Sequence, residues 1–553
     1  MAPCLLCLSS APPLLSPVSG DSLLTLLDSR CVTMRELRII HAGLIKAGSL
    51  STTTTLSISR LLAFCASPDG DMNYAAAIFA RVPRPNLFMW NTMIRGFSQS
   101  SSPEKAISLF IDMVTYSDVL PQRLTYPSVF KAYAGLGRAD AGAQLHGWIL
   151  KLGLEYDPFV RNTIIHMYAN CGSLGEAHQV FDGSSELDIV AWNSLIMGYA
   201  KSGEMEESRR LFDMAPGRNT VTWNSLLSGY VRNGQFIDAL NLFHEMQKSD
   251  VRPSRHTMVT LLNASAHLGS LTQGRWVHKY LTRMGFELNP IVVTALIDMY
   301  SKCGYICRAY EIFQTAPEIG LSCWNSMILG LARNGHEEEA VHLFSQLESS
   351  SFKPDSVSFI GVLTACNHGG FVDKAIKYFR AMTERYSIIP TLKHFSCLVD
   401  LLGRLGCVEE AEQLIREMPV EADVVLWGSL LWASWKHGNA DVAERAAERL
   451  IDLDPGESSG YVIMSNVHAS SGKFREAAEG RISMKEIRVE KVPGCSSIEV
   501  NGQVHEFIAG GGRGHPRAEE IYWVLNEMVP LLQEVGLIHQ PGQAEWLEEI
   551  LQQ

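Results

Sequence analysis

Hydrophobic positions recur along this chain with the spacing of one helix face, and a repeated Trp-Asn dipeptide marks each recurrence. The dipeptide occurs at Trp90-Asn91, Trp192-Asn193, Trp223-Asn224 and Trp324-Asn325, and a degenerate copy follows at Trp427-Gly428. Apolar residues stand four and seven positions after each Trp of the four full copies, which predicts one apolar stripe of an α-helix. Asn lies about 100° around the helix from this stripe. We therefore expect Asn162, Asn193, Asn224 and Asn325 to be more exposed than Trp192, Trp223 and Trp324.

A second helix is predicted after each of these helices. The Gly that can end the first helix is Gly172, Gly203, Gly234, Gly304 or Gly335. The second helix carries Ala and Phe four residues apart, so that a small residue lets two helices approach while an aromatic ring fills the gap. The pairs are Ala75/Phe79, Ala106/Phe110, Ala177/Phe181, Ala239/Phe243, Ala309/Phe313 and Ala340/Phe344, with Ser208/Phe212 as a variant.

The spacing of the dipeptides defines the repeats. Successive Asn residues of the dipeptide are 102, 31 and 101 residues apart, which are sums of repeats of about 35 and 31 residues. Periods of this size are typical of stacked helix pairs, which bury their apolar faces on their neighbours. We predict an all-α fold, an α-solenoid superhelix of antiparallel helix-turn-helix repeats. The repeats begin at residues 56, 87, 123, 158, 189, 220, 255, 290, 321, 356 and 392, and the last ends at 423.

The charge is unevenly distributed along the chain. The formal net charge is −12, and residues 392–553, with 14 basic and 26 acidic residues, hold all of this excess. A surface that binds phosphates is usually basic. The neutral array before residue 392 is therefore a better candidate for a nucleic-acid interface than the acidic end, which we expect to bind partner proteins.

The residue patterns do not predict a catalytic or metal site. The 12 cysteines are scattered, and we expect Cys171 and Cys303, each before a helix-ending Gly, to be core thiols in a reducing compartment. Cys4-x-x-Cys7 has no second pair beside it, as a zinc site would require. His336-Glu-Glu338 matches half of the zinc deaminase signature, but no Cys-x-x-Cys follows. We expect a protein that is not an enzyme and has no cofactor, small-molecule substrate or membrane partner.

The first 29 residues lack Lys and Arg and are rich in Ser, Pro and Leu. They resemble an organelle transit peptide of the Ser-rich, acid-poor kind, although such peptides usually contain Arg. A secretory signal is the alternative, which Pro12-Pro13 and the missing basic start disfavour. We expect a plastid protein rather than a mitochondrial one.

Several motifs together resemble the plant pentatricopeptide-repeat proteins of the long-and-short class. They are the 31/35 alternation, Trp-Asn-Ser, Pro354-Asp355, and Tyr-x-x-Cys-Gly ending at Gly172 and Gly304. The resemblance implies about 11–12 repeats over 30–423 and an E-type, TPR-like extension over 424–490, which contains Trp427-Gly-Ser-Leu-Leu431. Residues 491–553, with His505-Glu-Phe507 and His515-Pro516, resemble an E+-like segment with an acidic tail, and no DYW deaminase domain is expected.

In this family one repeat recognises one nucleotide of single-stranded RNA, and the resemblance places recognition at position 5 and the last residue of each repeat. An Asn amide offers a donor and an acceptor to a pyrimidine, and an Asp carboxylate accepts from the N3–H of uracil. The implied preferences are U for Asn162/Asp188 and Asn325/Asp355, a pyrimidine for Asn193/Asn219, C for Asn224/Ser254 and G for Ser396/Asp423. Poorly specified pairs are Asn91/Gln122, Thr294/Gly320 and Asn289 with Val259, together with Pro127/Asp157 and Ile360/Thr391.

The resemblance implies a site-recognition factor for C-to-U editing of organellar RNA, with a DYW-type deaminase and editing accessory proteins recruited in trans. One alternative is a factor for RNA stability or splicing, which the E-type extension disfavours. A second is a TPR-like protein scaffold, which the 31/35 alternation disfavours. A single Asn at position 5 would more simply be a solvated or capping residue, but five copies in phase favour recognition.

Overall fold

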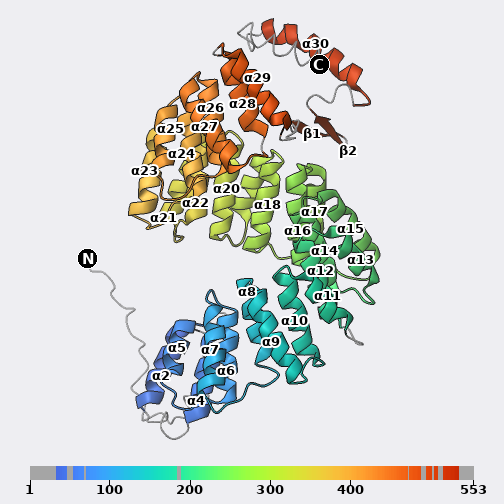
Figure 1. Ribbon diagram of the computed structural model, residues 1–553, viewed down its shortest axis with the longest axis vertical. Coiled ribbons are helices and arrows are strands. Elements are labelled where there is room, and N and C mark those ends of the chain that lie inside the picture. The colour runs from blue at the N-terminus through green and yellow to red at the C-terminus, as the bar shows by residue number, and fades with distance from the viewer. Residues whose placement is uncertain are drawn as a thin grey trace, which may run out of the picture. The chain divides into compact units, whose positions relative to one another are not determined.

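The structure is a computed structural model that describes residues 33–46, 54–67, 70–183, 188–456, 458–470, 472–486, 494–500, 503–508 and 515–534. The expected transit peptide and the end of the acidic tail lie outside the described residues. The chain divides into two compact bodies, Met1–Arg252 and Pro253–Gln553, which are both drawn in Figure 1. We refer to them as the N-terminal and C-terminal bodies.

The N-terminal body consists of helices that alternate between the first and second member of a pair. They are α2 (Met34–Lys46), α4 (Thr54–Cys65), α5 (Met72–Phe79), α6 (Leu87–Ser98), α7 (Glu104–Tyr116), α8 (Tyr126–Leu136), α9 (Ala139–Lys151), α10 (Pro158–Asn170), α11 (Leu174–Asp182), α12 (Ile189–Lys201), α13 (Met205–Met214), α14 (Thr220–Arg232) and α15 (Phe236–Lys248).

The C-terminal body continues the alternation. Its helices are α16 (Arg255–Leu268), α17 (Leu271–Arg283), α18 (Pro290–Lys302), α19 (Ile306–Thr315), α20 (Leu321–Arg333), α21 (Glu337–Ser349), α22 (Ser356–Gly369), α23 (Val372–Glu384), α24 (Leu392–Arg404), α25 (Val408–Glu417), α26 (Val424–Lys436), α27 (Ala440–Leu453), α28 (Ser458–Ser470), α29 (Phe474–Glu486) and α30 (Ala518–Glu534). The prediction of an α-solenoid of antiparallel helix pairs is confirmed.

One β-hairpin was not predicted. Strands β1 (Cys495–Val500) and β2 (Gln503–Ile508) pair antiparallel with Cys495 opposite Ile508, and they form the sole sheet of the described residues. The sequence contains a signal for it, because an Asn-Gly dipeptide, here at 501–502, between two short segments with β-branched residues favours a hairpin. The hairpin lies within 491–553, outside the repeats.

Successive repeats are joined by an edge-to-face contact between two aromatic rings. The Phe of a second helix meets the Trp of the next first helix, with ring centroids 4.8 Å apart for Phe181–Trp192 and Phe212–Trp223 and 5.0 Å apart for Phe313–Trp324. This is the preferred geometry for aromatic pairs. Ala177 and Ala309, one turn before their Phe, are fully buried, as the sequence predicts.

The predicted helix-ending glycines are confirmed. Gly172, Gly203, Gly234, Gly304 and Gly335 all have positive φ, between 74° and 86°, a conformation that side chains other than Gly rarely adopt. Cys171 and Cys303 precede two of them as C-cap residues and are half-buried, so the expectation that they are core thiols is wrong. Their position at the helix end, rather than on the apolar stripe, explains the difference.

A partly buried His–Tyr hydrogen bond recurs between helices. Burial lowers the pKa of His146 and His278, and also that of His41, where Arg81 adds to the effect. Each ring therefore remains neutral near neutral pH, where it can accept from a Tyr hydroxyl. The Nδ1 to Oη distances are 2.8 Å for His41–Tyr74, 3.2 Å for His146–Tyr168, 2.9 Å for His178–Tyr199 and 2.9 Å for His278–Tyr300.

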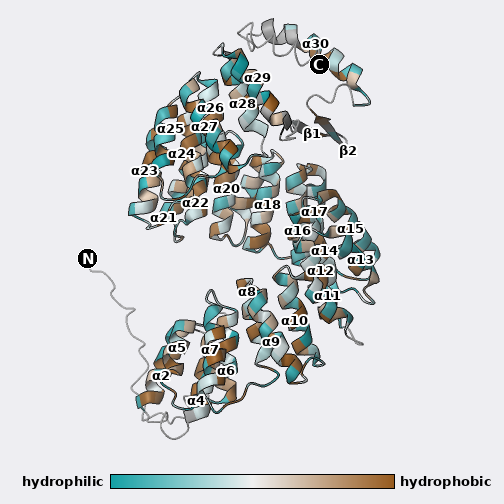
Figure 2. Cartoon of the chain, viewed as in Figure 1, coloured by the Kyte–Doolittle hydropathy of each residue, from teal (hydrophilic) through white to brown (hydrophobic). Residues whose placement is uncertain are grey.

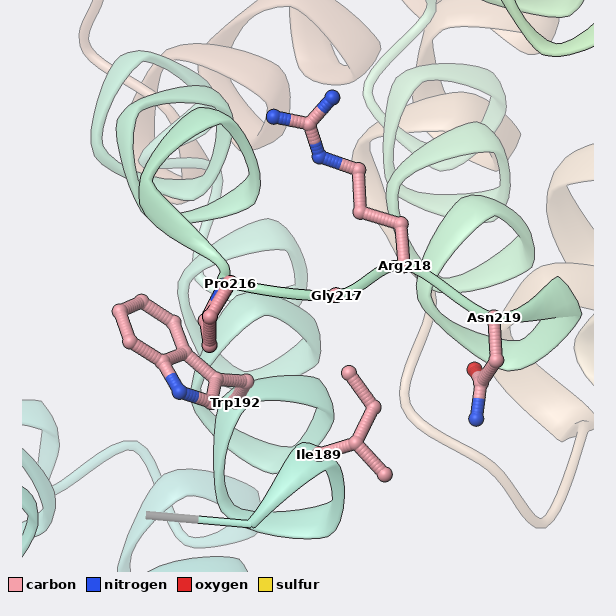
Figure 3. A pocket seen from close by; sticks show the side chains of 6 residues that line it. All are labelled: Ile189, Trp192, Pro216, Gly217, Arg218 and Asn219. Carbon is pink, nitrogen blue, oxygen red and sulfur yellow. The ribbon is translucent and has the colours of Figure 1, made fainter. Parts of the chain in front are cut away.

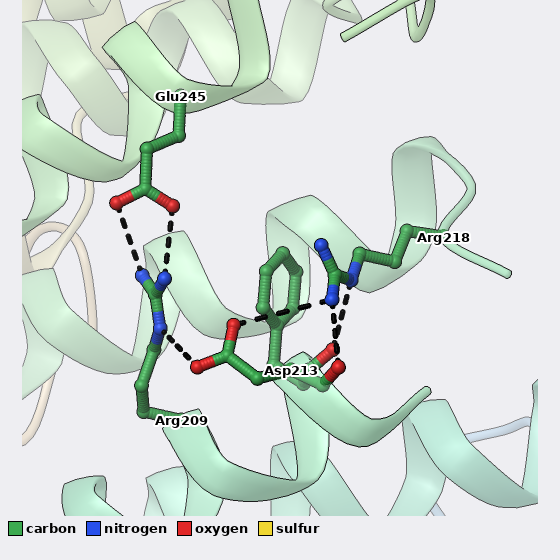
Figure 4. Close-up of polar contacts among 5 residues, drawn as sticks. Arg209, Asp213, Arg218 and Glu245 are labelled. Atoms are coloured by element: carbon green, nitrogen blue, oxygen red, sulfur yellow. Dashed lines mark hydrogen bonds and ion pairs between the residues drawn. The ribbon is translucent and has the colours of Figure 1, made fainter. Parts of the chain in front are cut away.

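Ion pairs connect second helices of neighbouring repeats. Figure 4 shows Arg209 of α13 between Glu245 of α15, 2.9 Å away, and Asp213, 3.0 Å away. Arg218 donates to the main-chain carbonyls of Phe212 and Asp213 at 2.9 and 2.8 Å. These side chains are partly solvated, so each pair contributes little to stability. They do position the 215–219 linker that enters α14.

Hydrophobic and hydrophilic residues are interleaved along the helices of both bodies (Figure 2). Buried apolar side chains occur in nearly every helix rather than in one central core. Within the described ranges, none of the helices has the length and apolar character needed to cross a bilayer.

We expect Trp223→Ala to destabilise the N-terminal body by about 3–5 kcal/mol, because a large side chain that is only 3% exposed is lost. Urea unfolding measures the loss in the free energy of unfolding, and hydrogen exchange should show lost protection in α13 and α14. Trp435→Ala, at a side chain that is 41% exposed, is the control and should cost less than about 0.5 kcal/mol. Equal losses for the two variants would contradict the packing role of Trp223.

We also expect stability to fall as the pH drops below about 6.5. The unfolded chain takes up protons near that pH, whereas His146 and His278, with their lowered pKa values, resist protonation in the native state. Thermal melting at about pH 7.5 and about pH 5.5 measures the effect. His278→Gln removes one such group and should reduce the pH dependence, and an unchanged dependence would argue against it.

Candidate functional site

The helices begin where the repeats are predicted to begin. First helices start at Leu87, Pro158, Ile189, Thr220, Arg255, Pro290, Leu321, Ser356 and Leu392. The last residue of one repeat is therefore the N-cap of the next first helix. Side chains at this position accept hydrogen bonds from backbone N–H groups of the first turn at Asn86, Asp157, Asp188, Asn219, Ser254, Asn289, Asp355 and Asp423.

The Asp188 carboxylate has two roles at once. Its Oδ1 accepts from the backbone N–H groups of Val190 and Ala191, both at 3.0 Å, which caps α12. Its Oδ2 accepts from the Asn162 amide at 2.7 Å. The predicted pair Asn162/Asp188 is thus in direct contact, and the cap fixes the carboxylate that orients the amide.

The pair Asn325/Asp355 is joined in the same way, with a third residue added. Asn325 Nδ2 donates to Asp355 Oδ1 at 3.0 Å, and Ser358 Oγ lies 2.6 Å from Asn325 Oδ1. Asp355 Oδ1 also accepts from the Ser358 backbone N–H at 2.9 Å and caps α22. Because both ends of the amide are bonded, the orientation of Asn325 is fixed.

The pair Asn91/Gln122 departs from this geometry. Asn91 Oδ1 accepts from Thr125 Oγ1 at 2.8 Å, and the Gln122 backbone N–H donates to the same hydroxyl at 3.1 Å. Thr125, not Gln122, is the N-cap of α8, which begins three residues later than the predicted repeat start. Pro127 lies in the first turn of α8, where a missing N–H is tolerated, and this shifts the helix start.

In the pairs Asn193/Asn219 and Thr294/Gly320, the two residues are not bonded to each other. Asn219 caps α14 through Thr222, while Asn193 Oδ1, like Asn162 Oδ1, is buried without a partner. Thr294 Oγ1 donates to the Pro290 carbonyl at 2.7 Å, and Gly320 caps α20 without a side chain. Asn224 lies in the N-terminal body and Ser254 in the C-terminal body. Asn289 caps α18, Ser396 is half-buried on α24, and Asp423 caps α26.

The expected exposure of the position-5 asparagines is largely wrong. Asn162, Asn193 and Asn325 are only 8%, 9% and 7% exposed. Trp192 is as buried as Asn193, Trp324 is more exposed than Asn325, and Asn224 is clearly more exposed than Trp223. First helices pack against each other as well as against second helices, so position 5 lies in the seam between consecutive first helices.

Two further rows of side chains were missed by the sequence analysis. The first is at position 2 of the repeats, one helical turn before position 5, where large apolar side chains face solvent. Phe88, Phe159, Val190, Val221, Ile291 and Val357 are each at least 50% exposed. Such side chains can pack against the flat face of a base. Apolar residues recurring directly after the N-cap, off the Trp stripe, were the available signal.

The second missed row is basic and lies at position 13, two turns after position 5. It consists of the exposed side chains Lys201, Arg232, Lys302, Arg333 and Arg404. Cations at helix C-termini are favoured by the helix dipole and can also bind phosphates. His166, at position 9 of its repeat, adds no charge near neutral pH, because burial and the nearby Lys201 and Lys131 lower its pKa.

A cavity of about 320 Å³ lies beside Asn219 and is lined by Ile189, Trp192, Pro216, Gly217, Arg218 and Asn219 (Figure 3). The side chains of Arg218 and Asn219 point to opposite sides of the linker. The Trp192 indole N–H is buried without a partner, but so are those of Trp90, Trp223 and Trp324. The unpaired indole is thus a property of the repeat and does not indicate a ligand here.

The described residues hold no group of three or more His, Cys, Asp or Glu side chains that could bind a metal ion. His336 is the N-cap residue of α21, and its Nδ1 lies 3.2 Å from Glu339. The contact partner, Glu339, lies outside the partial deaminase signature His336-Glu-Glu338.

Family models match over much of the array. The PPR repeat model matches residues 88–117, 159–187, 190–219, 357–386 and 393–421, and the PPR repeat family model matches 218–267 and 319–368. A model described as the E motif matches residues 437–499.

Similar proteins cover most of the chain. A chloroplastic pentatricopeptide repeat-containing protein of Arabidopsis thaliana is 60% identical over 517 residues, which are 93% of this chain and 92% of that protein. Another from the same plant is 40% identical over 95% of this chain and 84% of its own length. The crystal structure of the pentatricopeptide repeat protein PPR10 from maize has a TM-score of 0.50 at 19% identity, covering 85% of this chain and 74% of that one.

PPR10 in complex with an 18-nt psaJ RNA element gives a TM-score of 0.53 at 18% identity with the same coverage, and these likenesses concern the fold. The matching family models are those of the PPR repeat and the E motif, and the relatives are named for their repeats, in agreement with the expectation that the chain is not an enzyme. The chain belongs to the pentatricopeptide repeat protein family, in the class with long and short repeats and an E-type extension.

Proposed function

We propose that the chain binds single-stranded organellar RNA sequence-specifically and serves as a site-recognition factor for C-to-U editing. The observation that carries RNA recognition is the Asp188 carboxylate, which caps α12 and holds the Asn162 amide at 2.7 Å. This is a polar pair oriented by the fold rather than a solvated Asn. The solved complex of PPR10 with an RNA element supports a nucleic-acid ligand for this fold.

The geometry suggests how a base is recognised. With its Oδ1 used in capping, Asp188 presents Oδ2, which accepts from Asn162 and has a further lone pair for the N3–H of uracil. Exposed apolar side chains at position 2, such as Phe159 and Val190, lie one turn away and pack on base faces. Cations at position 13, such as Lys201, lie about 12 Å from position 5 along the axis of the helix. These cations bind the phosphates.

The assignment to editing is supported by the E motif over 437–499 and by the resemblance of residues 491–553 to an E+-like segment. We propose that the repeat array, 30–423, recognises the RNA. The E-type extension, 424–490, and the segment 491–553 with its acidic tail recruit a DYW-type deaminase and accessory proteins in trans. A plastid location is supported by the relative whose name describes it as chloroplastic.

The function is tested by sequencing the organelle transcriptomes of a plant line that lacks the protein. We expect one or a few cytidines to remain unedited in plastid transcripts, with editing restored by the full chain. Altered transcript ends or retained introns with all sites edited would instead indicate a stability or splicing factor. Normal transcripts with a lost protein complex would indicate a scaffold.

The recognition pairs are tested by changing Asn325 to Thr and Asp355 to Asn together. We expect one base preference to shift from U toward A, with about 1–3 kcal/mol lost on the original RNA, the range for one bidentate base contact. Gel-shift affinities at one salt concentration measure the change on RNAs that differ at one nucleotide.

Asp355→Asn alone is the control for folding, since Asn is as good an N-cap as Asp. Asn325 is buried and bonded to Ser358, so thermal melting of the double variant must accompany the affinities. An equal loss of affinity for all four bases would mean that the pair supports the fold and does not select the base.

A further inference from the structure

The first helix of the E-type extension, α26, carries two exposed tryptophans that the recognition scheme does not use. Trp432 is 46% exposed and Trp435 is 41% exposed, whereas Trp427 of the same helix packs against a buried cluster. Trp427 is at position 4, the usual place of the Trp in this repeat. Trp432 and Trp435 lie on other faces of the helix, so packing does not explain them.

The exposed tryptophans belong to the same helix face as the recognition positions. Counting from Asp423 as the last residue of the preceding repeat, Val425 is at position 2, Gly428 at position 5, Trp432 at position 9 and Lys436 at position 13. At about 100° per residue, these residues and Trp435 fall within an arc of about 100°. Val425 is 62% exposed, as position 2 is elsewhere. The row of apolar, recognition and basic positions thus continues into α26.

The recognition position itself is empty in α26. Gly428 has no side chain, and a Cβ added there would meet no atom within 4 Å. The helix therefore leaves an open space one turn from the Trp432 ring and has no group at position 5 to bond a base edge. A base in that space could be held by its face, not by its edge.

The charge of this face fits a nucleotide. Lys436 Nζ lies 5.0 Å from the Trp432 ring centroid, and α26 contains no Asp or Glu. This contrasts with the net negative charge of residues 392–553 as a whole. Arg404, the position-13 residue of the preceding repeat, is also exposed and is ion-paired with Asp400 at 3.1 Å, so Lys436 is the cation nearest the Trp432 ring. Single-stranded nucleic acids bind where a cationic groove carries aromatic rings for stacking.

We propose that Trp432 is a stacking platform for one unpaired nucleotide of the RNA, next to the nucleotide bound at Ser396/Asp423, with Lys436 binding its phosphate and Trp435 bordering the site. The proposal rests on the RNA recognition proposed above and extends it past the array. It also revises the expectation that the acidic end binds only partner proteins. Because Gly428 bonds no base edge, this nucleotide is held whatever its base.

The test uses the full chain and an RNA enriched from a random single-stranded pool. One abasic nucleotide is moved along that RNA, and the Kd is measured at one salt concentration. For the unchanged chain, we expect the abasic site to weaken binding at the recognised nucleotides and also at one nucleotide beyond them. The expected loss there is about 5- to 150-fold, as for one stacked base.

Trp432→Ala should bind the intact RNA about 5- to 150-fold more weakly and should no longer respond to the abasic site at the extra nucleotide. Trp432→Phe should recover most of the affinity, whereas Trp432→Leu, which is apolar but has no ring, should not. Trp276→Ala, an exposed Trp on the second helix α17, is the matched control and should bind as the unchanged chain does. Lys436→Ala should lower the salt slope by about one.

The proposal is overturned if Trp432→Ala binds the RNA normally, or if its response to the extra abasic site persists. Loss of deaminase recruitment with unchanged RNA affinity would also overturn it, since the face would then bind protein. In each of these outcomes the proposed function still holds if an abasic site at one of the recognised nucleotides weakens binding. Failure of the unchanged chain to enrich any RNA would overturn both.

Discussion

The edge-to-face contact between a second-helix Phe and the Trp of the next repeat determines where the functional side chains lie. In Phe181–Trp192 and Phe313–Trp324 it locks position 4 of a first helix against the preceding second helix. Position 5 is then turned into the seam between consecutive first helices, where Asn162 and Asn325 meet the capping residue of the next helix. A packing contact with no role in recognition thereby orients the amides that we propose to recognise bases.

Features set by local spacing could be predicted from the sequence. The Trp stripes, the Ala/Phe pairs and the helix-ending glycines depend on residues within one helix pair, and their positions match the structure. The burial of Asn193 and Asn325 could not be predicted in this way, since it arises from the packing of first helices from different repeats. One helical wheel has a single core side, whereas a first helix in this array has two packed sides.

The start of α8 is set by a proline in its first turn and not by the repeat length. The 35-residue period places a repeat start at residue 123, but Pro127 is tolerated only in the first helical turn, so the helix begins at Tyr126. Thr125 then replaces Gln122 as the N-cap and bonds Asn91. The poor specification expected for Asn91/Gln122 thus has a structural counterpart, because Gln122 lies outside the helix start that the other last residues cap.

The coupling of capping and recognition limits which residues can occupy the last position of a repeat. Good N-caps are Asn, Asp and Ser, followed by Thr and Gly, and the last residues include Asp188, Asn219, Ser254, Gly320, Asp355 and Thr391. Every one of these belongs to the capping set. If this position selects bases as we propose, a change of preference that exchanges one capping residue for another costs little helix stability, whereas other substitutions lose the cap. The proposed recognition can vary along the array because the residues to which we assign different base preferences are also residues that begin a helix.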